Sequence, residues 1–119
     1  MKGDPDELLP LRAVDVHVLL ALSHRDRHGY GLVQDIAGES EGRLQLLPGN
    51  LYGVLSRLMR DGLVREKDHR GAREHDERRR YYGITPLGKR VLAAELARMR
   101  DVLRLAETRR LLERPRTVP

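Results

Sequence analysis

The segment 46–64, which reads LLPGNLYGVLSRLMRDGLV, constrains the fold more than any other part of the chain. Pro48 suits the first position of a helix, where the missing N–H costs nothing, and Gly62 suits the left-handed residue that follows a helix. At ~100° per residue, the apolar side chains between them fall on one side of that helix. The segment therefore predicts a short amphipathic helix from Pro48 to about Asp61. Its apolar side consists of Leu51, Val54, Leu55, Leu58 and Met59.

The rest of the chain places this helix in a recognisable order of elements. Apolar spacing predicts one helix before it at 8–23 and a second at 29–37, then a turn at 38–43 and either a short strand or the end of the turn at 44–46. After it we expect strands at 63–68 and 79–84, and a long helix that begins with the N-cap pair Thr85-Pro86. We thus predict a mainly α (α+β) fold, a winged helix-turn-helix. Its expected parts are a DNA-binding domain at 8–85, a C-terminal dimerisation helix at 86–112, and flexible termini at 1–7 and 113–119.

The polar side of the 48–61 helix is unusual because it carries two glycines, which weaken a helix by ~1 kcal/mol each relative to alanine. Glycine on an exposed helix face is favoured where the backbone must approach another molecule closely. An asparagine can pair with an adenine edge, and arginine with guanine or phosphate. The alternative is a solvated face with incidental glycines. The candidate DNA-contacting residues here are Gly49, Asn50, Tyr52, Gly53, Ser56, Arg57 and Arg60.

The predicted wing at 65–80 holds seven basic and five acidic residues, a mild excess that also fits a solvated hairpin. Positive charge is densest in its last three residues, Arg78, Arg79 and Arg80, and we assign them to phosphate contact. The chain has a net charge of +5, which favours a polyanionic partner such as double-stranded DNA.

Three spaced motifs resemble those of PadR-like transcriptional regulators: HGYGLVQDI at 28–36, LPGNLYGVLSRLMRDGLV at 47–64 and RRRYYGITPLGKRVLAAE at 78–95. The resemblance covers about residues 15–100. It implies a winged-helix dimer, usually a repressor released from DNA by a small molecule or another signal. It also implies DNA contact by Tyr30, Gly49, Asn50 and Tyr52. Two positions depart from the family pattern: Asn50 replaces the usual threonine, and Leu47 replaces a small polar residue, so that a side-chain N-cap is lost.

The 86–112 helix carries a seam of apolar residues with 4-3-4-3 spacing, about two heptads long. The seam could pack on the chain's own 8–23 helix or against a second copy, and we expect both in a homodimer. A small-molecule effector, if one exists, would bind between these helices of the two chains. The chain has no Trp or Phe, which disfavours an aromatic-stacking pocket. The candidate dimerisation residues are Leu92, Leu96, Met99, Leu103 and Ala106.

Other function classes receive little support from the sequence. The chain has no cysteine, which excludes disulfides and thiolate metal sites, and its five histidines show no convincing ligand spacing. We expect no metal, no cofactor and no enzymatic activity, since no serine has a histidine–carboxylate pair nearby. No apolar run approaches the ~20 residues of a membrane span, and the protein is expected in the cytoplasm. The competing hypothesis is a winged helix that binds only protein, which would have a neutral recognition face.

Overall fold

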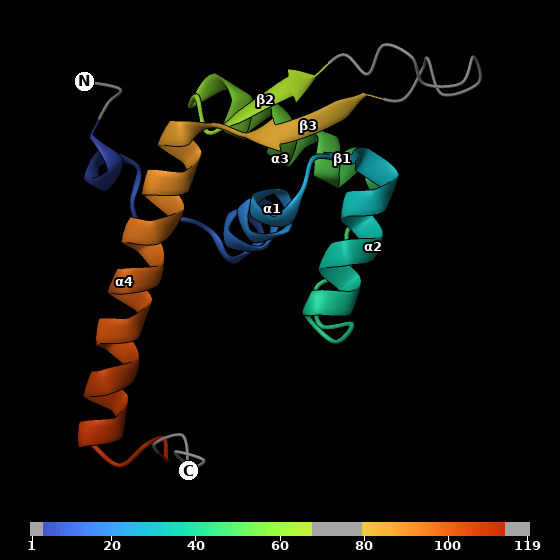
Figure 1. Ribbon diagram of the computed structural model, residues 1–119. Coiled ribbons are helices and arrows are strands. Elements are labelled where there is room, and N and C mark those ends of the chain that lie inside the picture. The colour runs from blue at the N-terminus through green and yellow to red at the C-terminus, as the bar shows by residue number, and fades with distance from the viewer. Residues whose placement is uncertain (1–3, 68–79, 114–119) are drawn as a thin grey trace.

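The computed structural model describes residues 4–67 and 80–113, which form four α-helices, a 3₁₀ helix and a small antiparallel sheet (Figure 1). The arrangement is the winged helix that the sequence predicts, with a long C-terminal helix. The elements are η1 (Pro5–Leu8), α1 (Ala13–His24), β1 (Arg27–His28), α2 (Gly29–Glu39), α3 (Pro48–Arg60), β2 (Val64–Lys67), β3 (Tyr81–Ile84) and α4 (Pro86–Thr108).

The first helix begins later than the apolar spacing predicted. α1 begins at Ala13 rather than at residue 8. Pro10 explains the difference, because proline inside a helix lacks the N–H for the helical hydrogen bond and clashes with the preceding turn. Residues 5–8 instead form η1, which packs against α4. The terminus predicted as flexible at 1–7 thus includes most of η1, and residues 1–3 lie outside the described part.

The sheet has the strand order β1-β3-β2 and is antiparallel throughout. Val64 pairs with Ile84 and Lys67 with Tyr81, which gives the expected hairpin, while the tip at 68–79 lies outside the described residues. The third strand is β1, in the stretch between the helices predicted at 8–23 and 29–37, and 44–46 is not a strand. A two-residue strand has no periodicity of its own, so only its pairing with β3 identifies it.

The core lies where α1, the inner faces of α2 and α3, the sheet and the first half of α4 meet. It consists mainly of aliphatic side chains, as expected for a chain without Trp or Phe. All five apolar residues predicted for α3 belong to the core or pack against it. The fully buried members include Val18, Leu19, Leu32, Ile36, Leu51, Leu55, Leu58 and Val91.

The connection between α3 and β2 holds the N-terminal turn of α4 in place. Gly62 has a φ of +78°, as predicted for the residue after the helix, and it leads the chain into β2. Thr85 caps α4 by accepting from the Gly88 N–H, and its own hydroxyl donates to the Gly62 carbonyl at 2.6 Å. A Cβ added at Gly88 would lie 2.2 Å from the Leu63 carbonyl oxygen, so only glycine permits this approach.

Candidate nucleic-acid interface

The outer face of α3 is open to solvent along its N-terminal half. Gly49, Asn50, Tyr52, Gly53 and Ser56 are all exposed, as the predicted helical phase requires. A Cβ added at Gly49 or Gly53 would have no neighbour within 4 Å. The fold therefore requires neither glycine, although each lowers the intrinsic stability of the helix.

The start of α3 lacks a side-chain cap. Leu47 occupies the N-cap position and makes no side-chain hydrogen bond, as its apolar character predicts. Pro48 has no N–H, and the first backbone bond closes from the Leu51 N–H to the Leu47 carbonyl. Two amides, those of Gly49 and Asn50, thus precede the first bonded turn, at the positive end of the helix dipole. This end of α3 carries no acidic residue in its first turn, so its electrostatic character suits an approaching anion.

The N-terminus of α2 lies beside this part of α3. His28 caps α2, its Nδ1 accepting from the Gly31 N–H at 3.1 Å, as expected for a structural residue at this position. The Tyr52 ring lies against Gly29, where an added Cβ would be 2.9 Å from the tyrosine hydroxyl. Tyr30 is next in the chain and is 65% exposed. The two tyrosines that the family resemblance implicated therefore come from two helices that meet at one surface.

Arg57, one of the predicted DNA contacts, has a partner within the chain. Its guanidinium donates two hydrogen bonds to the Asp15 carboxylate, from Nη1 at 3.0 Å and from Nη2 at 2.6 Å. The hydrogen bond to Asp15 raises the pKa of Arg57 and keeps it charged. The side chain is only 26% exposed and lies at the border of the polar face. The pair occupies two of the five N–H donors of the guanidinium, so part of its hydrogen-bonding capacity is used within the fold.

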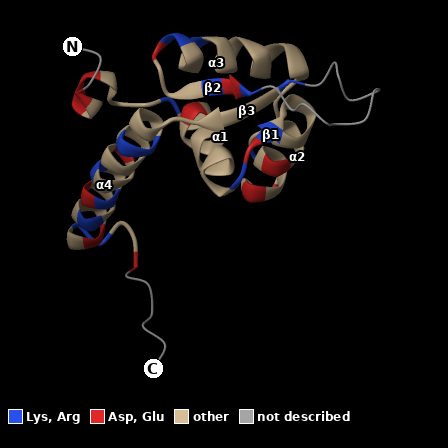
Figure 2. Cartoon of the chain, turned by 45° about the horizontal axis from the view of Figure 1, so that its top comes forward, with Lys and Arg blue, Asp and Glu red and all other residues tan. Residues whose placement is uncertain are grey.

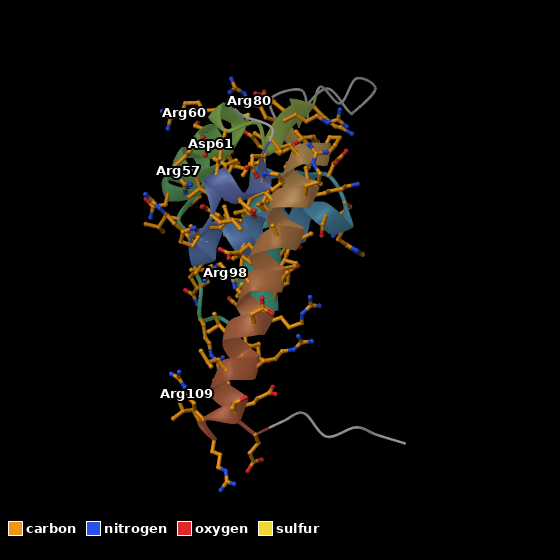
Figure 3. The ribbon with its side chains drawn as sticks, turned by 90° about the vertical axis from the view of Figure 1, so that its left-hand side faces the viewer. Arg57, Arg60, Asp61, Arg80, Arg98 and Arg109 are labelled. Carbon is orange, nitrogen blue, oxygen red and sulfur yellow. The ribbon has the colours of Figure 1, made fainter. Side chains whose placement is uncertain are left out.

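The remaining arginines differ in how far they are available (Figure 3). Arg60 is exposed near the end of α3, and Arg65 is exposed on β2. Arg80 is 71% exposed and lies 3.4 Å from Glu66 across the hairpin, a surface contact that is weak in water. Arg78 and Arg79 lie outside the described residues. Charge on α3 itself is confined to its C-terminal end, as Figure 2 shows.

The C-terminal half of α4 carries the second exposed feature. Leu96, Met99 and Leu103 are 38%, 40% and 50% exposed, and Ala106 is partly exposed. Leu92 is 5% exposed and belongs to the chain's own core, so its assignment to the dimer seam is wrong. The alternative, packing within the chain, holds for this first position because α1 and α4 are in contact there. Beyond it, Figure 1 shows α4 extending away from the other helices.

Two buried carboxylates escaped the sequence analysis. Asp15 and Glu95 are 2% and 1% exposed, and each holds an arginine. A signal was present, because each acidic residue falls within the apolar stripe of its helix. The apolar spacing of those stripes drew attention to the flanking leucines and valines instead.

An effector pocket between α1 and α4 was also predicted, and one chain does not test it. A hollow of about 420 Å³ opens at a different place, between α1 and the turn after α2. Its lining includes Ala13, His17, Glu39 and Arg43 but no residue of α4.

Comparison with known sequences identifies the family of the chain. Residues 18–94 match the transcriptional regulator PadR-like family. The chain belongs to the PadR-like family. It is therefore a transcriptional regulator of the winged-helix, DNA-binding class. An uncharacterized Lysinibacillus sphaericus protein is 28% identical over 95 residues, covering 77% of this chain and 85% of that protein. An uncharacterized 37.1 kDa protein of a Streptomyces fradiae transposon is 38% identical over 78 residues, covering 66% of this chain but 20% of that protein.

Solved structures of the family share the fold. A PadR family regulator from Clostridium difficile superposes with a TM-score of 0.69 at 21% identity, covering 82% of this chain and 97% of that one. Bacillus subtilis PadR, solved in complex with operator DNA, gives a TM-score of 0.61 at 18% identity, covering 92% of this PadR-like chain and 52% of that one. Within the described residues, no helix is both long and apolar enough to cross a membrane.

Proposed function

We propose that this PadR-like protein is a cytoplasmic, ligand- or signal-responsive repressor that binds a palindromic operator as a homodimer. The single observation that supports this most is the outer face of α3. Gly49 and Gly53 are exposed with free space around them, beside the exposed amide of Asn50. Helix-turn-helix proteins read base edges with the N-terminal residues of the recognition helix, and a face of small residues lets that backbone enter the major groove.

We assign Asn50 to a base edge and Tyr30, Tyr52 and Ser56 to the surrounding backbone. An amide both donates and accepts, which matches adenine N6 and N7. Hydroxyl groups and the arginines Arg60, Arg65 and Arg80 suit phosphate, which fixes orientation without specifying sequence. Arg78 and Arg79 would extend this phosphate-contacting group along the wing.

The homodimer is supported by the exposed seam of α4. Leu96, Met99 and Leu103 repeat at heptad spacing on a segment of α4 that extends away from the other described helices (Figure 1). A second α4 related by two-fold symmetry would cover them. Such a dimer would present two α3 helices to two half-sites.

Selection of bound sequences from a random duplex library tests the proposal. A repressor of this kind enriches an inverted repeat, and the Gly53→Leu variant enriches nothing. The competing function, a winged helix that binds only protein, predicts that wild type enriches no sequence and binds all duplexes equally weakly. Placing the selected operator between a promoter and a reporter then separates repression from activation.

A further inference from the structure

Asp15 of α1 and Glu95 of α4 bind neighbouring backbone N–H groups, and Asp15 also binds Arg57 of α3. Together these contacts form a junction that links α3 to α4. Each of the two carboxylates is buried, and a buried carboxylate is strongly disfavoured unless it is both paired and hydrogen-bonded. The two residues lie 80 positions apart, on α1 and α4, yet they have the same kind of partners. Each accepts one backbone N–H from the segment before α1, and each pairs with one arginine.

On the α3 side, Asp15 accepts from the Arg12 N–H at 3.2 Å and from Nη1 and Nη2 of Arg57. On the α4 side, Glu95 accepts from the Leu11 N–H and from Arg98 Nε. Leu11 and Arg12 are adjacent in the chain. Two neighbouring peptide groups are thus bound by two different helices, one by the carboxylate of α1 that holds α3 and the other by a carboxylate of α4.

This junction is one of several contacts that hold α4 to the rest of the chain. The others are the α3–β2 turn, where Thr85 bonds the Gly62 carbonyl and Gly88 contacts Leu63, the buried Val91 and Leu92, and the packing of η1 against α4. Glu95 lies seven residues beyond Gly88, about 10 Å along the helix axis. Charge-assisted hydrogen bonds impose a more specific geometry than apolar packing, so the junction restricts the direction of α4 beyond what its apolar contacts do.

That direction matters because α4 continues past the junction. From Glu95 to Thr108 the helix extends about 20 Å. A tilt of about 10° at the junction would displace its far end by about 3.5 Å, close to the rise of ~3.4 Å per base pair of DNA. We propose that Asp15 and Glu95 are positioning residues that set the angle between the recognition helix and the dimer helix, and thereby the half-site spacing that the dimer accepts. This inference rests on the proposed homodimer and its operator.

The test measures affinity against half-site spacing. The selected operator is rebuilt with its half-sites moved apart or together by single base pairs, and a duplex with one half-site serves as the reference. Wild type is expected to prefer one spacing by at least about tenfold over its neighbours, since spacing is a geometric property of the dimer. Glu95→Gln, which keeps the shape but loses the charge, should retain single half-site affinity and lose most of that preference or shift its optimum.

Arg98 provides a second variant, at a side chain that is itself 46% exposed. Its loss leaves the buried Glu95 without an ion-pair partner, so circular dichroism checks the folding of each Arg98 variant before binding is measured. Arg98→Ala leaves the Leu11–Glu95 hydrogen bond in place and should broaden the spacing profile, while Arg98→Lys should restore part of it. Arg104→Ala, a change at an exposed arginine of the same helix, should leave the profile unchanged. If Glu95→Gln does not fold, the Arg98 pair decides the outcome alone.

Two results would overturn the inference. Folded variants could keep the wild-type spacing optimum and its sharpness, or they could lose affinity equally for the full operator and the single half-site. Either would reduce Glu95, and with it the junction, to a role in stability. A wild-type dimer with no spacing preference would instead contradict the palindromic operator, and the inference with it.

Discussion

The outer face of α3 and the C-terminal half of α4 are both open surfaces, but their chemistry is opposite. The α3 face offers glycines, an amide and hydroxyls, with free space above the backbone. The α4 segment offers Leu96, Met99 and Leu103, and exposed leucines at heptad spacing indicate a protein partner. Binding at the α3 face suits a hydrated, negatively charged groove. Binding at the α4 segment is driven by the removal of apolar area from water. The difference indicates that the two surfaces take different partners.

The largest expected effect comes from the α4 surface. Leu96→Asp combined with Leu103→Asp should convert the dimer into a folded monomer, and operator affinity should fall by about 10²-fold or more because avidity is lost. Light scattering and a binding titration measure the two effects. Leu105→Asp is the matched control, since Leu105 lies about 160° around the helix from Leu103. A folded double variant that stays dimeric would show that α4 is not the interface.

A smaller but more selective effect is expected on α3. Gly53→Leu should raise the free energy of unfolding by up to about 1 kcal/mol, because leucine is the better helix former. Operator binding should fail nevertheless, because the new side chain blocks the groove. Gly38→Leu is a matched control on α2, where an added Cβ also has no neighbour within 4 Å. It should stabilise the protein and keep DNA affinity; unchanged binding in Gly53→Leu as well would exclude docking through this face.

Asn50→Ala tests base reading rather than steric access. It should cost about 1–3 kcal/mol on the operator and much less on random DNA, because only the cognate adenine loses its bidentate partner. Fluorescence anisotropy on both duplexes measures the difference. An equal loss on both would assign Asn50 to the phosphate backbone.

The wing should contribute affinity without sequence preference. Replacing Arg78, Arg79 and Arg80 with Ala should weaken binding to all duplexes alike, and should lower the slope of log affinity against log salt by about one unit for each lost phosphate contact. The titration is repeated across a range of salt concentrations. A constant slope, with loss confined to the operator, would mean that these arginines read bases or support the fold.

The smallest effect concerns the acid stability of the junction at Glu95. The hydrogen bond from Arg98 lowers the pKa of Glu95 below its usual value, against the opposing effect of burial. A carboxylate with a lowered pKa in the folded state stabilises the fold above its unfolded pKa of about 4.3, and this contribution is lost as the pH falls through the lower folded value. Urea unfolding of wild type and Glu95→Gln should therefore differ at pH 7 and converge towards pH 3. A difference independent of pH would mean that ionisation of Glu95 is not the source of the effect.

Most of the architecture could be predicted from sequence because its signals are local. Proline at the start of α3, Gly62 at its end and the Thr85-Pro86 cap of α4 fix helix boundaries through backbone chemistry alone. The errors arose where a distant partner decides the outcome. β1 exists only through its pairing with β3, and Leu92 is buried by packing against elements far away in the chain.

The sequence by itself determined the winged helix, the family and the phase of α3, because helical periodicity records which side chains need burial. Only the tertiary structure decided which partners the charged residues bind. Arg57 lies on the polar side of a helical wheel, and only the approach of Asp15 from α1 showed that two of its donors are bound within the fold. Glu95 likewise acquired a role from Leu11, 84 residues away. Ion pairs and hydrogen bonds act over a few ångströms between any two segments, and a linear sequence does not record which segments come that close.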